Sequence, residues 1–347
     1  MTGRERELAA IRREETDRLP IDVICIEPLE EIGAYLGVAP DAVYDALGID
    51  GRIVAPPHRR PQPQRPANPT ADEWGAPAGN DYGRHRSYPL ADTDTATAVE
   101  RHPWPDPTDY DYGSAAMAAR ALGDRYAVRG PYWLPIACRA FALFGMEEAL
   151  VRLHESDPGL LAALDRIADV SAGICERLLD ACGEAMPILC LGDDFATQRG
   201  LLMQPATWRR HLKPLYARLF EVGKRRGKLV WFHSCGDVTA VLGDLIDIGA
   251  DVWETVQLHA LPISASDLKR EYGRRLTFFG GINTQRLPFI GPVEVEAEVR
   301  EAIAALGPGG GYICGPDHHI KPDVDPAVAV ALFRAAVRFG HKASWRE

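Results

Sequence analysis

Short apolar runs alternate along this chain with longer segments in which apolar residues recur at helical spacing. The short runs are typical of buried parallel strands and lie at 21–26, 126–129, 187–191, 228–233, 251–253, 276–279 and 311–313. The longer segments have the 3.6-residue period of amphipathic helices. They predict helices at 3–16, 28–36, 40–47, 114–122, 146–154, 157–182, 205–226, 238–248, 264–271, 292–306 and 326–339.

Strands and helices that alternate at this spacing predict a parallel sheet covered by helices. The length of 347 residues suits two average domains, but it also suits one α/β barrel. No Gly-x-Gly-x-x-Gly opens the first helix, and the glycine-rich run at 307–310 precedes a strand, which is the wrong context for phosphate binding. We therefore predict a single (β/α)8 barrel domain over residues 1–347, with seven strands visible and an eighth unrecognised.

Residues 56–107 interrupt this pattern with a segment rich in Pro, Arg, Asn, Asp and Gly. One interpretation is a disordered linker. However, linkers lack aromatic residues, and Trp74, Tyr82, Tyr88 and Trp104 are spaced along this one. We favour an ordered insertion after the first β/α elements, built of a hairpin and loops, which acts as a lid or an interface at the barrel mouth.

Charge and composition exclude several classes of function. The net charge of −10 argues against nucleic-acid binding. The sequence contains no apolar run of membrane-spanning length, and its charged first residues lack the apolar region of a signal peptide, so we expect a cytoplasmic protein. In that compartment the seven cysteines are expected to be free thiols or metal ligands rather than disulfides.

The most informative chemistry follows the strand at 228–233, where the chain reads His233-Ser234-Cys235-Gly236-Asp237. Residues i and i+2 of a strand point to the same face, so His233 and Cys235 are expected to project together. The carboxyl ends of barrel strands are where active sites are built. An imidazole beside a thiolate is half of a zinc site, although a core His and a buried free Cys give the same pattern.

The last predicted strand supplies candidates for a third ligand, because it is followed by Cys314, His318 and His319. Three protein ligands and one open position make a catalytic zinc site. The residues alone do not decide between His318 and Cys314.

Polar residues also follow other predicted strands, and the sequence allows more than one role for each of them. Asp193 and Asp194 follow one strand, and one of them is expected to reach the site while the other caps a helix. Glu254 follows another strand as an acid/base, a fourth metal ligand or a salt-bridged structural residue. Asn283 offers an amide to a substrate, unless Gly280-Gly281 is only a tight turn.

Four segments together resemble the uroporphyrinogen decarboxylase superfamily, and most closely its methyltransferase-like branch. They are the His-Ser-Cys-Gly-Asp run at 233–237, the Gly-Asp-Asp-x-x-Thr-Gln segment at 192–198, the Gly-Gly-Ile-Asn-Thr-Gln turn at 280–285, and the tail that begins at Gly310. Asp72-Glu73-Trp74-Gly75 in the insertion is also similar. The resemblance implies a (β/α)8 barrel in which Gln198, Asn283 and Trp74 bind substrate and Asp193, Asp194 and Glu254 act in catalysis.

Members of the zinc-dependent branch hold the metal with His-x-Cys and a later Cys. His233 and Cys235 match the first two positions, whereas His318 occupies the third, so this chain departs from the pattern at one ligand. The resemblance implies Zn²⁺-dependent methyl transfer between a methylated corrinoid, carried by a partner protein, and a small thiol, folate or methoxylated compound. One alternative is a metal-free lyase acting on a carboxylated substrate through Asp193 or Asp194. Another is a non-catalytic corrinoid- or tetrapyrrole-binding partner.

Overall fold

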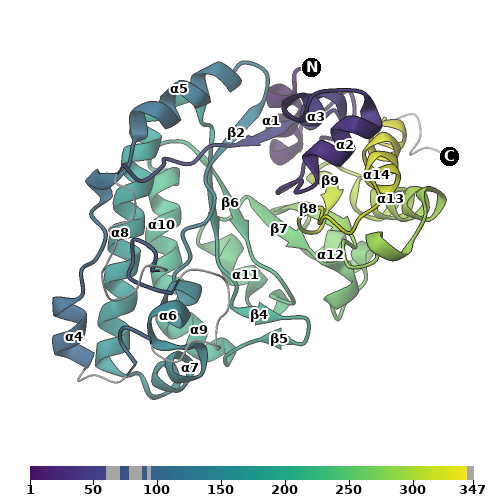
Figure 1. Cartoon of the computed structure of the whole chain (residues 1–347). Coiled ribbons are helices and arrows are strands. Elements are labelled where there is room, and N and C mark those ends of the chain that lie inside the picture. Colours follow the sequence, from purple (N-terminus) through teal and green to yellow (C-terminus); the bar gives the residue numbers. More distant parts are fainter. Residues whose placement is uncertain (60–70, 78–87, 92–94, 342–347) are drawn as a thin grey trace.

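A computed structural model describes residues 1–59, 71–77, 88–91 and 95–341 (Figure 1). Within these residues a curled sheet of seven parallel strands runs in the order β1-β2-β3-β6-β7-β8-β9. The strands are β1 (Gly51–Ile53), β2 (Ala127–Pro131), β3 (Ile188–Gly192), β6 (Leu229–His233), β7 (Val252–Val256), β8 (Thr277–Ile282) and β9 (Tyr312–Pro316). A two-stranded hairpin, β4 (Ala196–Thr197) and β5 (Gly200–Leu201), follows β3. The predicted parallel α/β architecture is confirmed in this TIM-like form.

The strand predicted at 21–26 is wrong as a regular strand, because the segment makes only isolated bridges to Cys314 and Ile320. It nevertheless lies between the two edges of the sheet. The carbonyl of Ile21 accepts the Asp50 amide at 2.8 Å, and the carbonyl of Pro20 accepts the Cys314 amide at 2.9 Å. Within the seven-stranded sheet, the strand that the sequence pattern missed is β1, whose three residues are too few to show a period.

Helices cover the outer face of the sheet, with α8 and α10 on one side and α13 and α14 on the other (Figure 1). The helix predicted at 205–226 is two helices that meet at Leu212 and Lys213. Pro214 lies in the first turn of the second one, where its missing amide proton costs no helical hydrogen bond. The helices are α1 (Gly3–Arg12), α2 (Leu29–Leu36), α3 (Val43–Ala46), α4 (Thr95–Arg101), α5 (Tyr112–Leu122), α6 (Ala137–Phe144), α7 (Met146–Glu155), α8 (Pro158–Cys182), α9 (Pro205–His211), α10 (Lys213–Lys224), α11 (Thr239–Asp247), α12 (Ala265–Tyr272), α13 (Pro292–Leu306) and α14 (Pro326–Phe339).

Alternation along the strands separates two hydrophobic clusters. The smaller cluster lies inside the curled sheet and contains Ile188, Trp231 and Phe279, together with Leu8 and Ile11 from α1. The larger cluster fills the space between the sheet and the helices. Because α1 contacts residues that precede β2 and β9, it covers the amino ends of the strands and leaves the carboxyl ends for the site.

The insertion is described only in part, since 60–70, 78–87 and 92–94, with the predicted contributor Tyr82, lie outside the described residues. Residues 71–77 form a turn closed by a bridge between Ala71 and Pro77. Trp74 in this turn is 2% exposed and packs in the larger cluster. The proposed lid or interface role of the segment stays a prediction. No helix among the described residues is long and apolar enough to cross a membrane.

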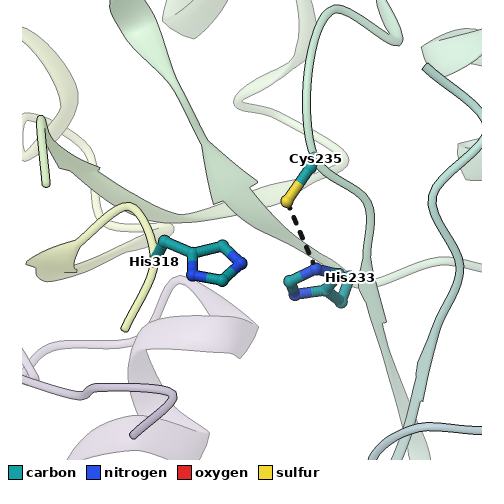
Figure 2. Close-up of side chains that lie close together, drawn as sticks. All are labelled: His233, Cys235 and His318. Atoms are coloured by element: carbon teal, nitrogen blue, oxygen red, sulfur yellow. Dashed lines mark hydrogen bonds between the residues drawn. The ribbon is translucent and has the colours of Figure 1, made fainter. Parts of the chain in front are cut away.

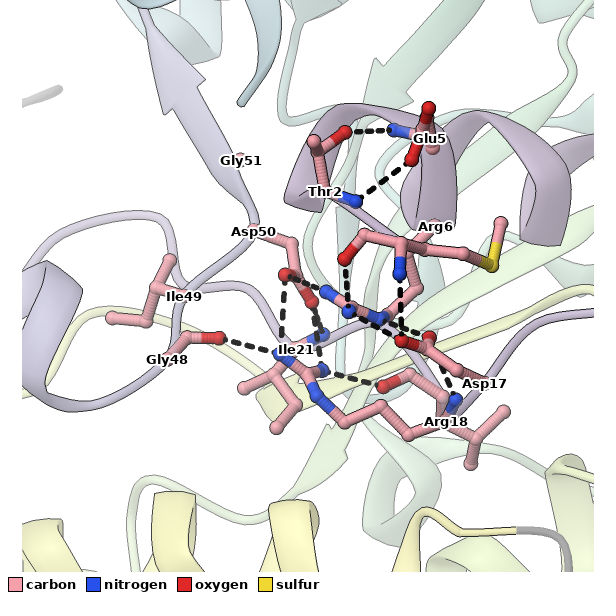
Figure 3. A network of polar contacts seen from close by, with 12 residues as sticks. Thr2, Glu5, Arg6, Asp17, Arg18, Ile21, Gly48, Ile49, Asp50 and Gly51 are labelled. Atoms are coloured by element: carbon pink, nitrogen blue, oxygen red, sulfur yellow. Dashed lines mark hydrogen bonds and ion pairs between the residues drawn. The ribbon is translucent and has the colours of Figure 1, made fainter. Parts of the chain in front are cut away.

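Charged side chains tie α1 to the amino end of the sheet (Figure 3). Arg6 donates to Asp17 at 2.7 Å and to Asp50 at 2.6 Å, and Arg18 donates to the same Asp50 at 2.8 Å. Asp50 also accepts the Ile21 amide at 2.9 Å, and its side chain is 5% exposed. This nearly buried carboxylate therefore links α1 to the extended segment between the sheet edges.

The Arg6–Asp17 pair predicts part of the acid sensitivity of the fold. Hydrogen bonding from Arg6 holds the pKa of Asp17 well below its usual range, so the pair stabilises the protein above the unfolded pKa of about 3.9 and is lost as pH falls further. Because Asp17 is 42% exposed, we expect its contribution to stay below about 1 kcal/mol. Urea unfolding from pH 7 to pH 3 should show the difference between wild type and Asp17→Asn shrinking below about pH 4; a constant difference would contradict this assignment.

Candidate metal centre

His233, Cys235 and His318 converge at the carboxyl end of the sheet (Figure 2). His233 is the last residue of β6 and faces the inside of the sheet with Trp231, two residues earlier. Cys235 follows in the next loop, and His318 lies in the loop after β9. One ligand atom from each residue lies within 4.8 Å of the other two. Within the described residues this is the single group of three such side chains able to hold a metal ion.

The donor set and its spacing fit zinc. Cys235 Sγ lies 3.6 Å from His233 Nε2. Zinc distances of about 2.3 Å to sulfur and about 2.05 Å to nitrogen, joined at a tetrahedral angle, place the two donor atoms about 3.6 Å apart. The His233 and His318 rings meet edge to face with centroids 6.0 Å apart. One thiolate and two imidazoles are ligands that zinc accepts, and they would leave a fourth position open.

Glu254 orients His233 for this role. Its Oε1 accepts from His233 Nδ1 at 2.7 Å, and its Oε2 accepts from the indole N–H of Trp231. A proton held on Nδ1 leaves Nε2, the atom facing Cys235, as a ligand atom. Burial alone raises the pKa of Glu254, but the hydrogen bond and charge of His233, the charge of Arg129 and the hydrogen bond from Trp231 outweigh it and lower the pKa. A buried, ionised Glu254 is thus placed behind the imidazole rather than among the ligand atoms.

The electrostatics of the group favour a cation at its centre. Burial lowers the pKa of His318 to about 4, so its imidazole is neutral at pH 7 and has a free lone pair. At His233 burial acts in the same direction, but Cys235 and Glu254 outweigh it and raise the pKa. A proton and a metal ion compete for the same Nε2 lone pair, so surroundings that favour one positive charge also favour the other.

Asp193 and Asp194 point in different directions, as adjacent residues after a strand do. Asp194 Oδ1 accepts the Cys235 amide at 2.8 Å and lies 3.6 Å from His233 Nε2. It therefore borders the group formed by His233, Cys235 and His318, which we call the metal group. Asp193 is buried and accepts the Tyr216 hydroxyl at 2.6 Å. It also accepts three backbone amides at the start of α6, from Ile136, Ala137 and Cys138, at 2.6–2.9 Å. The structure therefore places Asp193 as a helix cap, outside the metal group.

Asp193→Asn should destabilise the fold without changing metal binding. The amide nitrogen of Asn would face donors, and hydrogen bonds to a charged group contribute about 1.5–3 kcal/mol each, so we expect a loss of about 2–3 kcal/mol in urea unfolding. Metal content per chain should equal that of wild type. A variant with normal stability that loses its metal would contradict this role.

The remaining predicted residues lie away from the metal group. Cys314 is fully buried among the residues between sheet and helices, because Ile313, its neighbour on β9, takes the inward direction; burial raises its pKa to about 12. Trp74 is a core residue, with the guanidinium of Arg139 stacked 4.8 Å from its ring. Gln198 lies at the turn of the β4–β5 hairpin, 3.3 Å from His259. Asn283 lines a cavity of about 460 Å³ beside the same histidine.

Several residues of the site escaped the sequence analysis. Tyr132 and Trp133 follow β2, and their rings lie 5.8 and 5.6 Å from that of His233. The Tyr132 hydroxyl is 3.4 Å from His233 Nδ1. Both residues follow the carboxyl end of a strand, where active-site residues of α/β barrels lie, and this position is the signal that predicts them. Thr255 also lies at the site, where its hydroxyl is 3.2 Å from the Ser234 carbonyl oxygen and 3.7 Å from Cys235 Sγ.

Comparisons with known proteins found a family that matches most of the chain and a solved structure with a similar fold. The family described as uroporphyrinogen decarboxylase (URO-D) matches residues 89–339. A uroporphyrinogen decarboxylase of Magnetococcus marinus is 24% identical over 255 residues, and one of Pseudomonas aeruginosa is 23% identical over 250. Both matches cover 68% of this chain but 66% of the relative. A solved methyltransferase from Methanosarcina mazei is 19% identical to this chain and superimposes on it with a TM-score of 0.68. The match covers 98% of this chain and 99% of the methyltransferase chain.

Proposed function

The chain belongs to the uroporphyrinogen decarboxylase family, and from that premise we propose that it is a zinc-dependent methyltransferase on a (β/α)8 frame. The proposed reaction moves a methyl group between a corrinoid, held by a partner protein, and a small thiol, folate or methoxylated compound. The observation that carries the proposal is the convergence of His233, Cys235 and His318 within 4.8 Å. The likeness in fold to a solved methyltransferase supports the same choice.

Each residue of the centre has a distinct part in this proposal. His233 Nε2, Cys235 Sγ and a ring nitrogen of His318 hold the metal, while Cys314 packs in the core. Zinc held in this way supplies Lewis acidity, which lowers the pKa of an added thiol ligand and makes it nucleophilic near neutral pH. Glu254 fixes the direction of His233, and the Thr255 hydroxyl lies 3.7 Å from the Cys235 sulfur.

Asp194 is the carboxylate best placed to meet a substrate. It lies beside the metal group and its side chain is 36% exposed, whereas Glu254 is fully buried. Its Oδ1 is held by the Cys235 amide, which orients the carboxylate without consuming all of its acceptor capacity. We infer that Asp194 accepts a hydrogen bond from the incoming acceptor, or takes up its proton, at the entrance to the centre.

The decarboxylase alternative has support from the names of the curated relatives, but it needs a carboxylate free to stabilise a protonated intermediate. Asp193 is not free, because both of its oxygens are occupied by hydrogen bonds inside the fold. Only Asp194, among the two carboxylates considered for that role, remains at the site. The alternative also leaves the convergence of His233, Cys235 and His318 without a purpose.

The function is tested by incubating the zinc-loaded protein with methylcobalamin and a panel of small thiols and folates. We expect demethylation of the corrinoid, followed by its change in visible absorbance, with one class of acceptor and not in Cys235→Ala. A zinc-loaded protein that is inert with every acceptor, yet releases CO2 from a carboxylated tetrapyrrole, would instead establish the lyase.

A further inference from the structure

The loop that carries His318 is anchored by the residue before it, Asp317. This side chain is 1% exposed. Its Oδ1 accepts the amide of Thr284 at 3.0 Å and the hydroxyl of the same residue at 2.7 Å. Its Oδ2 is buried without a hydrogen-bond partner among the described residues, and the Nδ1 atom of His259 lies 3.5 Å from it.

His259 extends this contact to a third loop. It follows β7 in the short 3-10 turn Leu258–Ala260, and its side chain is 27% exposed. When Nδ1 carries the proton that faces Asp317, Nε2 is an acceptor, and the Gln198 amide nitrogen lies 3.3 Å from it. Contacts from Gln198 to His259 and from His259 to Asp317 therefore join the β4–β5 hairpin to the loops after β7 and β9.

Asp317 is a buried carboxylate that directly precedes the candidate ligand His318. Burying a carboxylate costs free energy unless its oxygens are paired, and Asp317 is paired incompletely. The Cα atoms of Asp317 and His318 are about 3.8 Å apart across a trans peptide, so a fixed Asp317 leaves His318 little freedom of position. Neither Thr284 nor His259 belongs to the metal group, so they act on it only through this loop.

We propose that Asp317 and His259 are positioning residues that hold His318 ready to bind the metal. The inference rests on the proposed function, because it requires His318 to be a ligand. A ligand that is already in place loses less conformational entropy on binding, so the support contributes to metal affinity. Asp317 and His259 do not touch the metal, and their loss should leave the number of bound ions unchanged.

The test compares the zinc affinity of wild type with that of Asp317→Asn, measured by competition with a chromophoric chelator at one pH. The amide oxygen of Asn still accepts from Thr284, whereas its NH2 group now faces His259. We expect one zinc per chain with a dissociation constant raised roughly tenfold, at the low end of the 10–100-fold cost of losing supporting contacts. Binding of Co²⁺ gives a second readout, since its visible bands report the ligand geometry and should shift in the variant.

Two further variants separate positioning from general stability. His259→Asn changes a partly exposed side chain, so it should fold even if Asp317→Asn does not, and it should also weaken zinc binding. Asp325→Ala is the matched control, because Asp325 caps the start of α14 in the same connection, accepting the Ala327 amide at 2.8 Å. This control should lower the unfolding midpoint without changing zinc affinity or the Co²⁺ spectrum.

The outcomes distinguish this inference from the function on which it rests. Weaker zinc binding and an altered Co²⁺ spectrum in the Asp317 or His259 variants, but not in the control, support it. Equal affinity in wild type and both variants overturns the positioning role and leaves the metal centre intact. A wild-type protein that takes up no zinc overturns the proposed function and this inference with it.

Discussion

Cys235→Ala is expected to bind zinc about a hundred to a thousand times more weakly than wild type and to lose zinc-dependent methyl transfer. Structural zinc sites with four protein ligands contribute about 10–16 kcal/mol, which is about 2.5–4 kcal/mol per ligand, and each 1.4 kcal/mol is a factor of ten. The thiolate is also the one anionic donor in the His233–Cys235–His318 group, so its loss leaves two neutral imidazoles. Zinc content after dialysis and a competitive titration measure the effect.

Cys314→Ala is the matched control, because it removes the other thiol that the sequence offers as a ligand. Cys314 is fully buried in the cluster between sheet and helices, so we expect a packing loss of about 1 kcal/mol in urea unfolding and unchanged zinc binding. The reverse result, with zinc lost in Cys314→Ala and retained in His318→Ala, would show that the third ligand comes from β9 itself.

Glu254 is the second position with a large expected effect. Glu254→Gln keeps an oxygen for His233 Nδ1 but loses the negative charge, and we expect zinc affinity to fall about tenfold. Glu254→Ala leaves both His233 Nδ1 and the Trp231 N–H without an acceptor, so its loss should approach a hundredfold. Competitive zinc titration of the two variants at one pH measures whether the loss of affinity is smaller in Glu254→Gln than in Glu254→Ala.

The graded order is what distinguishes support of His233 from direct ligation. If Glu254 were itself a ligand, its carboxylate would bind the metal and Gln would be nearly as damaging as Ala. A loss that is equally large in both variants would therefore contradict the role assigned here. Normal zinc affinity in Glu254→Ala would show that His233 does not depend on this hydrogen bond.

The sequence predicted the parts of the fold that have a long or regular period. The helices at 292–306 and 326–339 and the strand at 228–233 lie within one residue of α13, α14 and β6. It missed β1, which is held by its pairing with β2 and by the bonds of the preceding Asp50 backbone to Ile21 and Ala127 rather than by its own composition. It also missed α6, whose start is capped by Asp193 across 55–57 residues of chain. Contacts between residues so far apart in the sequence do not change the local pattern of apolar and polar residues, so that pattern does not predict them.

The same distinction holds at the site. The spacing of a strand predicts His233 and Cys235 as neighbours, and they do lie together, although β6 ends at His233 and Cys235 lies in the following loop. The choice between His318 and Cys314 needed the structure, since the direction of Cys314 depends on how β9 sits in the sheet. Asn283 and Gln198, which are predicted to contact substrate, lie around His259, and their role stays a prediction. No local pattern brings the loops after β3, β7 and β8 to one histidine.

The central claim is that one sulfur and two imidazole nitrogens of this chain hold zinc, and zinc K-edge X-ray absorption of the purified protein tests it most directly. We expect one sulfur at about 2.3 Å and two imidazole nitrogens at about 2.0–2.1 Å, with one further light atom. Two sulfurs would bring Cys314 into the centre in place of His318. Protein that contains no zinc and takes up none on reconstitution would contradict the metal centre and return the search to carboxylated substrates at Asp194.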